Sequence, residues 1–226
     1  MKSMKPRSHD FQKWKVAFRE KAHLLIEVGY TKGRSNIESH DHEEQEITEF
    51  IVSTIKDWMR SPESPPWCKY FDIHEEAPVP KQKSHGKSRP RTDILIRWCA
   101  HQERPEYIFE AKRLREKGYG AGKYTGSEGM GCFTEGLYAA EYDEAAMIGY
   151  VQSHTLSHWK EQLQKSITKK EGILYLKAPQ CDEMVIAGFP LEWVSEHERK
   201  GEKNGSIRIY HLLLDCSPLA QSSPLS

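Results

Sequence analysis

Two acidic residues and a lysine stand at the ends of neighbouring apolar segments. Asp93 comes early in the run 91–98, and Glu110 and Lys112 come late in the run 107–114. A polar turn separates the two runs, so they are expected to form adjacent strands of a hairpin. Residues i and i+2 of a strand point to one face, so Glu110 and Lys112 project together. Pairing in register would place Asp93 across from them.

These residue types suit one kind of chemistry. Two carboxylates that converge on one point form a hard-oxygen site suited to Mg²⁺, or to Mn²⁺. A lysine beside them can orient or activate a water, or stabilise charge on a phosphate. Metal-assisted hydrolysis of a phosphodiester bond requires this combination. Solvated strand ends are the competing explanation, but charges that interrupt apolar strands favour a functional site.

The spacing resembles the signature of the PD-(D/E)xK nuclease superfamily, in which an Asp is followed on the next strand by Glu/Asp-x-Lys. In this chain Pro90 is separated from Asp93 by two residues instead of preceding it directly. The resemblance implies a Mg²⁺-dependent endonuclease that leaves a 5′ phosphate. Asp93, Glu110 and the carbonyl of Ala111 would bind the metal. Lys112 would position the attacking water or stabilise the pentavalent phosphate.

The helix before the hairpin is expected to supply one more acid, again by resemblance. The apolar pattern predicts a helix that starts near Ser39 or Asp41 and ends at Met59. Glu43 and Glu44 lie on the core-facing side of its first turn. Glu44 is the preferred catalytic candidate and Glu43 the alternative. Acids also favour helix N-termini and fit a capping box, so a capping role competes with the catalytic one.

The remaining segments predict an α/β fold. Hydrophobic periodicity and turn residues indicate elements at the following positions: a helix from Asp10 to Val28 ended by Gly29 and Gly33, a strand at Trp67–Glu75, a helix from Ser127 with Met130, Phe133 and Leu137 on one side, a buried strand at Ala145–Gln152, a helix at Thr155–Thr168, and strands at Met184–Phe189, Trp193–Arg199 and Ile207–Leu214. Over residues 40–152 this order resembles the restriction-endonuclease-like αβββαβ core, with a mixed central sheet.

The 226 residues fit one domain. We expect a single nuclease-like domain over 1–226, with an N-terminal packing helix in 10–38, the core in 39–170 and additional C-terminal strands in 171–216. Hydrophobic residues make up 37% of the chain and charged residues 29%, enough for a core beneath a polar surface. No apolar run is long enough to span a membrane.

The charge balance and the cysteines restrict the partners and the compartment. Lys and Arg together number 33, as do Asp and Glu, so a non-specific coat of nucleic acid is not expected. Five separated cysteines without CxxC spacing argue against a disulfide framework or a zinc ribbon and indicate the cytoplasm. The N-terminus has no apolar segment typical of a signal peptide.

A basic loop leads into the predicted site. Residues 77–89 carry several lysines and an arginine among Pro, Ser and Gly. Contact with a phosphate backbone and a solvated hairpin loop explain this loop equally well.

A second resemblance lies after the hairpin. The pattern that runs from Tyr124 through Glu128 to Tyr138, together with Met147–Val151, resembles a group of uncharacterised bacterial proteins of the same superfamily, often suspected of roles in anti-phage or restriction systems. The implied partners are nucleic acid, DNA before RNA, proteins of a defence complex and a second copy of the chain. The sequence does not place Glu128 relative to the site.

Two other functions compete with the nuclease. Some members of the superfamily keep the fold and lose the activity, so the chain could be a binding or assembly subunit of a multiprotein complex. A metal hydrolase that uses histidines ranks last, because the eleven histidines show no HExxH or comparable spacing. His40 and His42 are expected near a helix cap. His197 and His211 could approach each other, and a structural role is expected for them before a catalytic pair.

Overall fold

A seven-stranded mixed sheet organises the chain. The computed structural model describes residues 8–78, 90–100, 104–200 and 205–218. In spatial order β1-β2-β3-β4-β7-β6-β5, the strands are β1 (Phe71–Pro78), β2 (Arg91–Trp98), β3 (Glu106–Leu114), β4 (Glu144–Val151), β7 (Ser206–Asp215), β6 (Trp193–Glu198) and β5 (Cys181–Asp182). β4 runs parallel to both neighbours, β3 and β7, whereas the other pairs are antiparallel. The fold is therefore of the α/β class.

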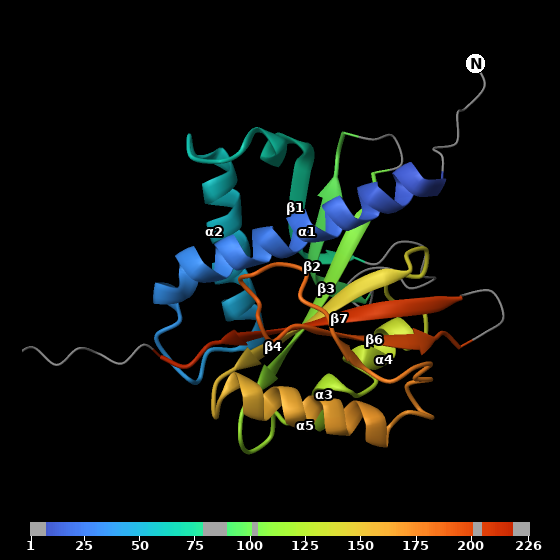
Figure 1. The fold of residues 1–226 in the computed structure, drawn as a ribbon. Coiled ribbons are helices and arrows are strands. Elements are labelled where there is room, and N and C mark those ends of the chain that lie inside the picture. The colour runs from blue at the N-terminus through green and yellow to red at the C-terminus, as the bar shows by residue number, and fades with distance from the viewer. Residues whose placement is uncertain (1–7, 79–89, 101–103, 201–204, 219–226) are drawn as a thin grey trace, which may run out of the picture.

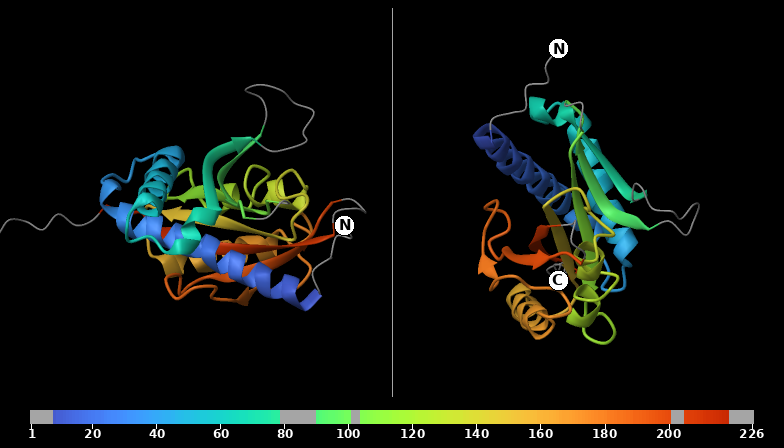
Figure 2. Two further views of the ribbon diagram at one scale, coloured as in Figure 1. Left: turned by 90° about the horizontal axis from the view of Figure 1, so that it is seen from above. Right: turned by 90° about the vertical axis from the view of Figure 1, so that its right-hand side faces the viewer.

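Helices cover both faces of this sheet (Figure 1). They are α1 (Ser8–Gly33), α2 (Glu44–Arg60), α3 (Ala121–Tyr124), α4 (Met130–Thr134) and α5 (Leu156–Lys169), with 3-10 turns η1 (Arg34–Asn36) and η2 (Pro66–Tyr70). One core cluster joins α1 and α2 to the sheet, and a second joins α3, α4 and α5 to its other face. Figure 2 shows these layers from two further directions.

Several predicted elements are confirmed within one or two residues. The β2–β3 hairpin, the interior strand β4, α5, β6 and β7 all lie where the sequence predicts them. From Ala145 to Val151 every residue of β4 is buried, as a strand covered on both faces requires. The C-terminal segment contributes β7 to the middle of the sheet, where it pairs with β4.

The first helix continues past the predicted end. α1 runs through Gly29 and ends at Gly33. A Cβ on Gly29 would lie 2.7 Å from the carbonyl oxygen of Ile51 and 2.5 Å from Cγ1 of Ile55. Gly29 therefore serves the close crossing of α1 over α2 instead of terminating the helix.

Two elements, α2 and β1, begin later in the chain than the sequence predicts. α2 begins at Glu44, later than Ser39 or Asp41, because Glu43 is its N-cap residue and its backbone N–H donates to Oε2 of Glu46 over 2.7 Å. The strand predicted from Trp67 begins at Phe71, because prolines open the 3-10 turn η2 before it.

The prediction of one helix from Ser127 with Leu137 on its buried side is wrong. Only Met130–Thr134 is helical, and Leu137 is 42% exposed. A Cβ on Gly129 would lie 2.2 Å from the carbonyl oxygen of Tyr124, so the chain folds back tightly there and starts a new, shorter helix.

The strand predicted at Met184–Phe189 is also absent from the described residues. The backbone N–H of Val185 donates to Oε2 of Glu192 over 2.9 Å, so a side chain takes the place of a strand partner. The basic loop expected in 77–89 lies outside the described residues from position 79 onward. In the part of the chain that is described, no helix has both the length and the apolar character needed to cross a membrane.

Candidate active site

The β2–β3 hairpin separates at the predicted site. The strands pair only between 94–97 and 106–109, and beyond this β3 continues beside β4. One residue past the ladder, Oδ2 of Asp93 accepts a hydrogen bond from the backbone N–H of Ala111 over 2.7 Å. A carboxylate thus replaces the strand partner, and the hairpin register brings Asp93 beside Glu110.

Lys112 contacts all of the oxygen ligands expected at the site. Its Nζ lies at the following distances: 2.8 Å from Oε1 of Glu110, 3.0 Å from Oε1 of Glu44, 2.6 Å from the carbonyl oxygen of Ala111 and 4.0 Å from Oδ2 of Asp93. We call Glu44, Asp93, Glu110 and Lys112 the acidic cluster. One ammonium group therefore holds three carboxylates from two strands and a helix in contact.

Helix geometry separates the roles of the two candidate glutamates. Glu44, in the first turn of α2, accepts from Lys112 and also from the backbone N–H of Arg113, over 3.1 Å to Oε2. Glu43, the N-cap residue, instead pairs with the Arg113 guanidinium over 2.5 Å. Arg113 also donates to the carbonyl of His42 over 3.2 Å. Glu44 joins the cluster, and Glu43 holds the arginine beside it.

Burial and charge change the protonation of the cluster. Burial and the carboxylate of Asp93 raise the pKa of Glu110 well above its ordinary value, despite Lys112. Burial also raises the pKa of Asp93, although Lys112 and the Ala111 N–H oppose this. Burial alone would lower the pKa of Lys112, but the three carboxylates outweigh it and raise the pKa. Lys112 is therefore a cation, and the Glu110–Asp93 pair retains a proton to a higher pH than isolated carboxyl groups would.

The donor set fits a hard divalent cation. Oε2 of Glu110 is buried and has no hydrogen-bond partner among the described residues, so a buried polar oxygen is left without a partner. Asp93, Glu110 and the Ala111 carbonyl are ligands that Mg²⁺ or Mn²⁺ prefers. Within the described ranges, however, no group of three or more His, Cys, Asp and Glu side chains is arranged to hold a metal ion. Lys112 contacts the oxygens instead.

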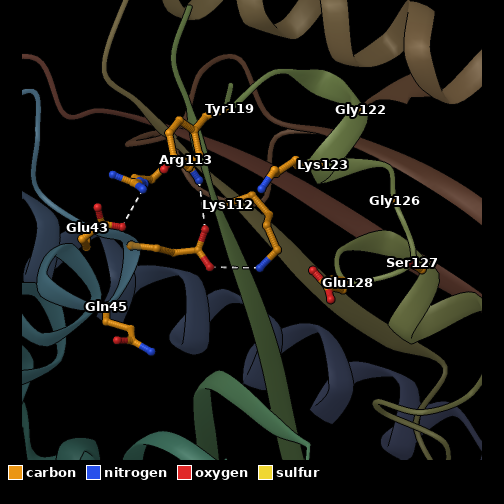
Figure 3. Close-up of a pocket in the computed structure, with 11 residues that line it drawn as sticks. Glu43, Gln45, Lys112, Arg113, Tyr119, Gly122, Lys123, Gly126, Ser127 and Glu128 are labelled. Carbon is orange, nitrogen blue, oxygen red and sulfur yellow. Dashed lines mark hydrogen bonds and ion pairs between the residues drawn. The ribbon is translucent and has the colours of Figure 1, made fainter. Parts of the chain in front are cut away.

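A pocket of about 590 Å³ opens beside the acidic cluster. The start of α2 forms one wall, Lys112 and Arg113 the floor, and residues 119–128 the other wall (Figure 3). The carboxylate of Glu128 points across the pocket toward Lys112 (Figure 3). The structure thus places Glu128, whose position the sequence left open, on the wall facing the cluster.

Sequence reasoning missed the aromatic side of this pocket. The guanidinium carbon of Arg113 lies 3.9 Å from the ring centroid of Tyr119, and Nζ of Lys123 lies 5.5 Å from it. Strand alternation was the one sequence feature that bears on this contact, because it predicts that Arg113 points to the opposite face of β3 from Lys112 and has another partner. Nothing in the local sequence indicated that Tyr119 would be that partner.

The side chains of the remaining histidine candidates make their contacts with residues outside the cluster. Oγ of Ser195 is 2.7 Å from Nε2 of His197 and 2.7 Å from Nε2 of His211, so the two histidines approach each other through a serine. All three side chains are buried, which suits the structural role predicted for them. Nδ1 of His40 lies 2.8 Å from the carbonyl oxygen of Gln152, and His42 packs edge-on against Phe50 near the start of α2.

No protein-family model, no curated protein and no solved structure matches this chain.

Proposed function

We propose that the protein is a metal-dependent phosphodiesterase that cleaves nucleic acid, DNA before RNA, as an endonuclease of the PD-(D/E)xK type. The observation that carries the proposal is the buried Oε2 of Glu110, which has no partner among the described residues, inside a cluster of three carboxylates and one lysine. A structural ion pair has no need of two further acids, because each additional buried carboxylate is destabilising. The excess negative charge is what a divalent cation would compensate.

The order of the elements supports the same proposal. A helix that supplies Glu44 precedes three antiparallel strands, and the third strand, which carries Glu110 and Lys112, pairs in parallel with β4. This sequence of elements agrees with the restriction-endonuclease-like core that the motif resembles. Asp93 and Glu110 come from the two strands that separate at the site.

Asp93, Glu110 and the carbonyl of Ala111 would hold the cation, with Glu44 beside them. A bound Mg²⁺ or Mn²⁺ would neutralise charge on the scissile phosphate and lower the pKa of a water. Lys112 would supply positive charge next to the phosphate and orient the attacking water, since its raised pKa keeps it an ammonium. Glu44 positions Lys112, and Arg113 anchors Glu44 through its backbone N–H.

A cleavage assay tests the proposal. Wild type, Lys112→Ala and Asp93→Asn are incubated with supercoiled plasmid, linear duplex, single-stranded DNA and RNA, in Mg²⁺, Mn²⁺ or EDTA. Lys165→Ala, on the exposed face of α5, is the matched control. We expect cutting of the circular plasmid that requires the metal, is kept by Lys165→Ala, and falls by roughly 10²–10³-fold in the site variants, as for loss of a preorganised charge. Cutting that persists in EDTA or in Asp93→Asn would exclude this site.

One observation favours a second function. Lys112 already satisfies Glu44, one oxygen of Glu110 and the Ala111 carbonyl without a metal, as an inactive binding or assembly subunit would require. Thermal unfolding in Mg²⁺ separates the two functions. A metal site raises the unfolding free energy by about 2.7 kcal/mol at a hundred times Kd, and the rise disappears in Asp93→Asn. A folded wild type that neither cuts nor responds to Mg²⁺ would favour the subunit.

A further inference from the structure

The pocket beside the acidic cluster is of the size that encloses one small molecule. Its volume of about 590 Å³ falls within the range of ligand sites, roughly 300–1,000 Å³. Lys112 and Glu44 belong both to the cluster and to the pocket lining. A ligand in the pocket would therefore touch the residues proposed to cleave the phosphodiester bond. One nucleotide fits such a space, whereas the two paired strands of a duplex do not.

The charges of the pocket leave one cation available. Lys112 is paired with Glu44 and Glu110, and Arg113 with Glu43. Lys123 lines the same pocket, is exposed, and has no ion-pair partner within the described residues. Its ammonium can therefore bind a phosphate without breaking an ion pair.

An aromatic ring lies next to that cation. Tyr119 lines the pocket and is partly exposed, with Nζ of Lys123 5.5 Å from its ring centroid. The guanidinium of Arg113 lies against the ring at 3.9 Å and is itself anchored by Glu43 and the carbonyl of His42. A tyrosine held in place beside a lysine is the combination with which proteins bind unpaired bases and the adjoining phosphate.

Hydrogen bonds from α5 and the residue that follows it hold the pocket wall at residues 122–125 in place. Nζ of Lys170 donates to the carbonyl of Gly122 over 3.3 Å and to Oγ1 of Thr125 over 2.8 Å. A Cβ on Gly122 would meet no atom of the described residues within 4 Å, so the described fold does not require a glycine there. At Gly126 it would meet the Gly122 carbonyl at 2.9 Å, so that glycine is structural. The missing side chain at Gly122 leaves open space at the pocket wall.

We propose that this pocket binds one unpaired nucleotide of the substrate strand, with its base against Tyr119 and its phosphate at Lys123. The substrate class is single-stranded nucleic acid, or a nucleotide that leaves its duplex to enter the pocket. This inference rests on the proposed function, because it places the nucleotide beside the acidic cluster.

Fluorescence anisotropy with short labelled oligothymidylate, oligouridylate and the matching DNA duplex tests the proposal in EDTA, where metal-dependent cleavage cannot proceed. We expect wild type to bind a single strand at least tenfold more tightly than duplex, because unpairing opposes binding of the duplex. The DNA and RNA probes show which single strand is preferred. Tyr119→Ala should weaken binding roughly tenfold or more, whereas Tyr119→Phe keeps the ring and the affinity. Lys123→Ala should reduce the slope of log affinity against log salt by about 0.7.

A pair of glycine variants tests the pocket itself. Gly122→Phe would place a bulky side chain at the pocket wall, whereas Gly172→Phe places the same side chain at an exposed position with equally open surroundings. Only the first should abolish binding, with both proteins unfolding at the wild-type temperature. Equal binding of duplex and single strand, or wild-type affinity in both Tyr119→Ala and Gly122→Phe, would overturn the proposal.

The two proposals fail in different ways. Metal-dependent cleavage that is lost in Lys112→Ala, together with unchanged affinity in both Tyr119→Ala and Gly122→Phe, would reject the nucleotide pocket and keep the nuclease. Binding that depends on Tyr119 in a protein that cuts no substrate would reject the nuclease and keep the pocket.

Discussion

Glu110 is the residue at which stability and the proposed activity oppose each other. Its side chain is 6% exposed, and only one of its oxygens is paired with Lys112. Its raised pKa means that the ionised form is disfavoured in the folded protein. The contribution of Glu110 to stability is therefore fully present below the ordinary carboxyl pKa and is lost as pH rises toward the raised one.

We predict that Glu110→Gln stabilises the protein and abolishes its cleavage activity. A neutral amide removes the buried charge and can donate toward Asp93, so the gain is about 1–3 kcal/mol at pH 8, or several degrees in Tm, and less at pH 5. Thermal unfolding at both pH values measures it. Glu161→Gln, on the surface of α5, should change little. A variant less stable than wild type at both pH values would show that the Glu110–Lys112 pair outweighs the cost of burial.

At the level of elements, the crossing of α1 and α2 places Glu44. Gly29 lies where α1 meets Ile51 and Ile55 of α2, and a Cβ there would come within 3 Å of both residues. α2 carries Glu44 at its first turn, so the position of this helix sets the distance from Glu44 to Lys112.

We predict that Gly29→Ala destabilises the protein by about 1–3 kcal/mol, the usual cost of overpacking, which lowers Tm by several degrees. Gly172→Ala is the control, at an exposed turn where an added Cβ would meet no atom of the described part of the chain within 4 Å. Thermal denaturation of the two variants measures the difference. Equal Tm values would show that α1 and α2 can move apart without a loss of stability.

A buried hydrogen-bond chain ties α3 to the far strands of the sheet. It runs through Tyr124, His211, Ser195 and His197 to the carbonyl of Leu174, with each step 2.7–2.9 Å long. The carbonyl only accepts, so Nδ1 of His197 carries the proton and its Nε2 accepts from Ser195. Ser195 then accepts from Nε2–H of His211, whose Nδ1 accepts from Tyr124. Both histidines are neutral, and with these proton positions each hydrogen bond in the chain has one donor and one acceptor.

For the whole molecule, this chain makes stability depend on pH. Burial lowers the pKa of His197 to about 4 and that of His211 well below its ordinary value. Between pH 6.5 and about 4 the unfolded chain binds protons that the folded protein does not, so stability falls as pH falls. Glu110 acts in the opposite sense, because its folded-state pKa is raised.

We predict that the free energy of unfolding decreases by up to about 1.4 kcal/mol per pH unit for each of the two histidines as pH falls below 6.5. Urea denaturation from pH 7 to pH 5 measures the slope. His211→Asn should reduce the slope, whereas replacement of the exposed His154 by Asn should leave it unchanged. The same slope in His211→Asn as in wild type would contradict the prediction, because Glu110 affects both proteins equally.

The sequence by itself determined the features that depend on neighbouring residues. Two apolar runs and a turn predict the β2–β3 hairpin, and period-two alternation predicts that Glu110 and Lys112 share a face with Asp93 opposite. The continuous apolar run from Ala145 likewise predicted the buried strand β4. These features were predictable because strand alternation and hairpin register are local.

Only the tertiary structure decided which distant residues meet. The position of the helix cap distinguishes the role of Glu44 from that of Glu43. The role of Gly29 follows from the close crossing of α1 over the next helix, α2. Tyr119 and Glu128 line one pocket with Glu44, which lies far from them in the chain. Such contacts arise from packing between elements separated in sequence, and no periodicity within one segment encodes them.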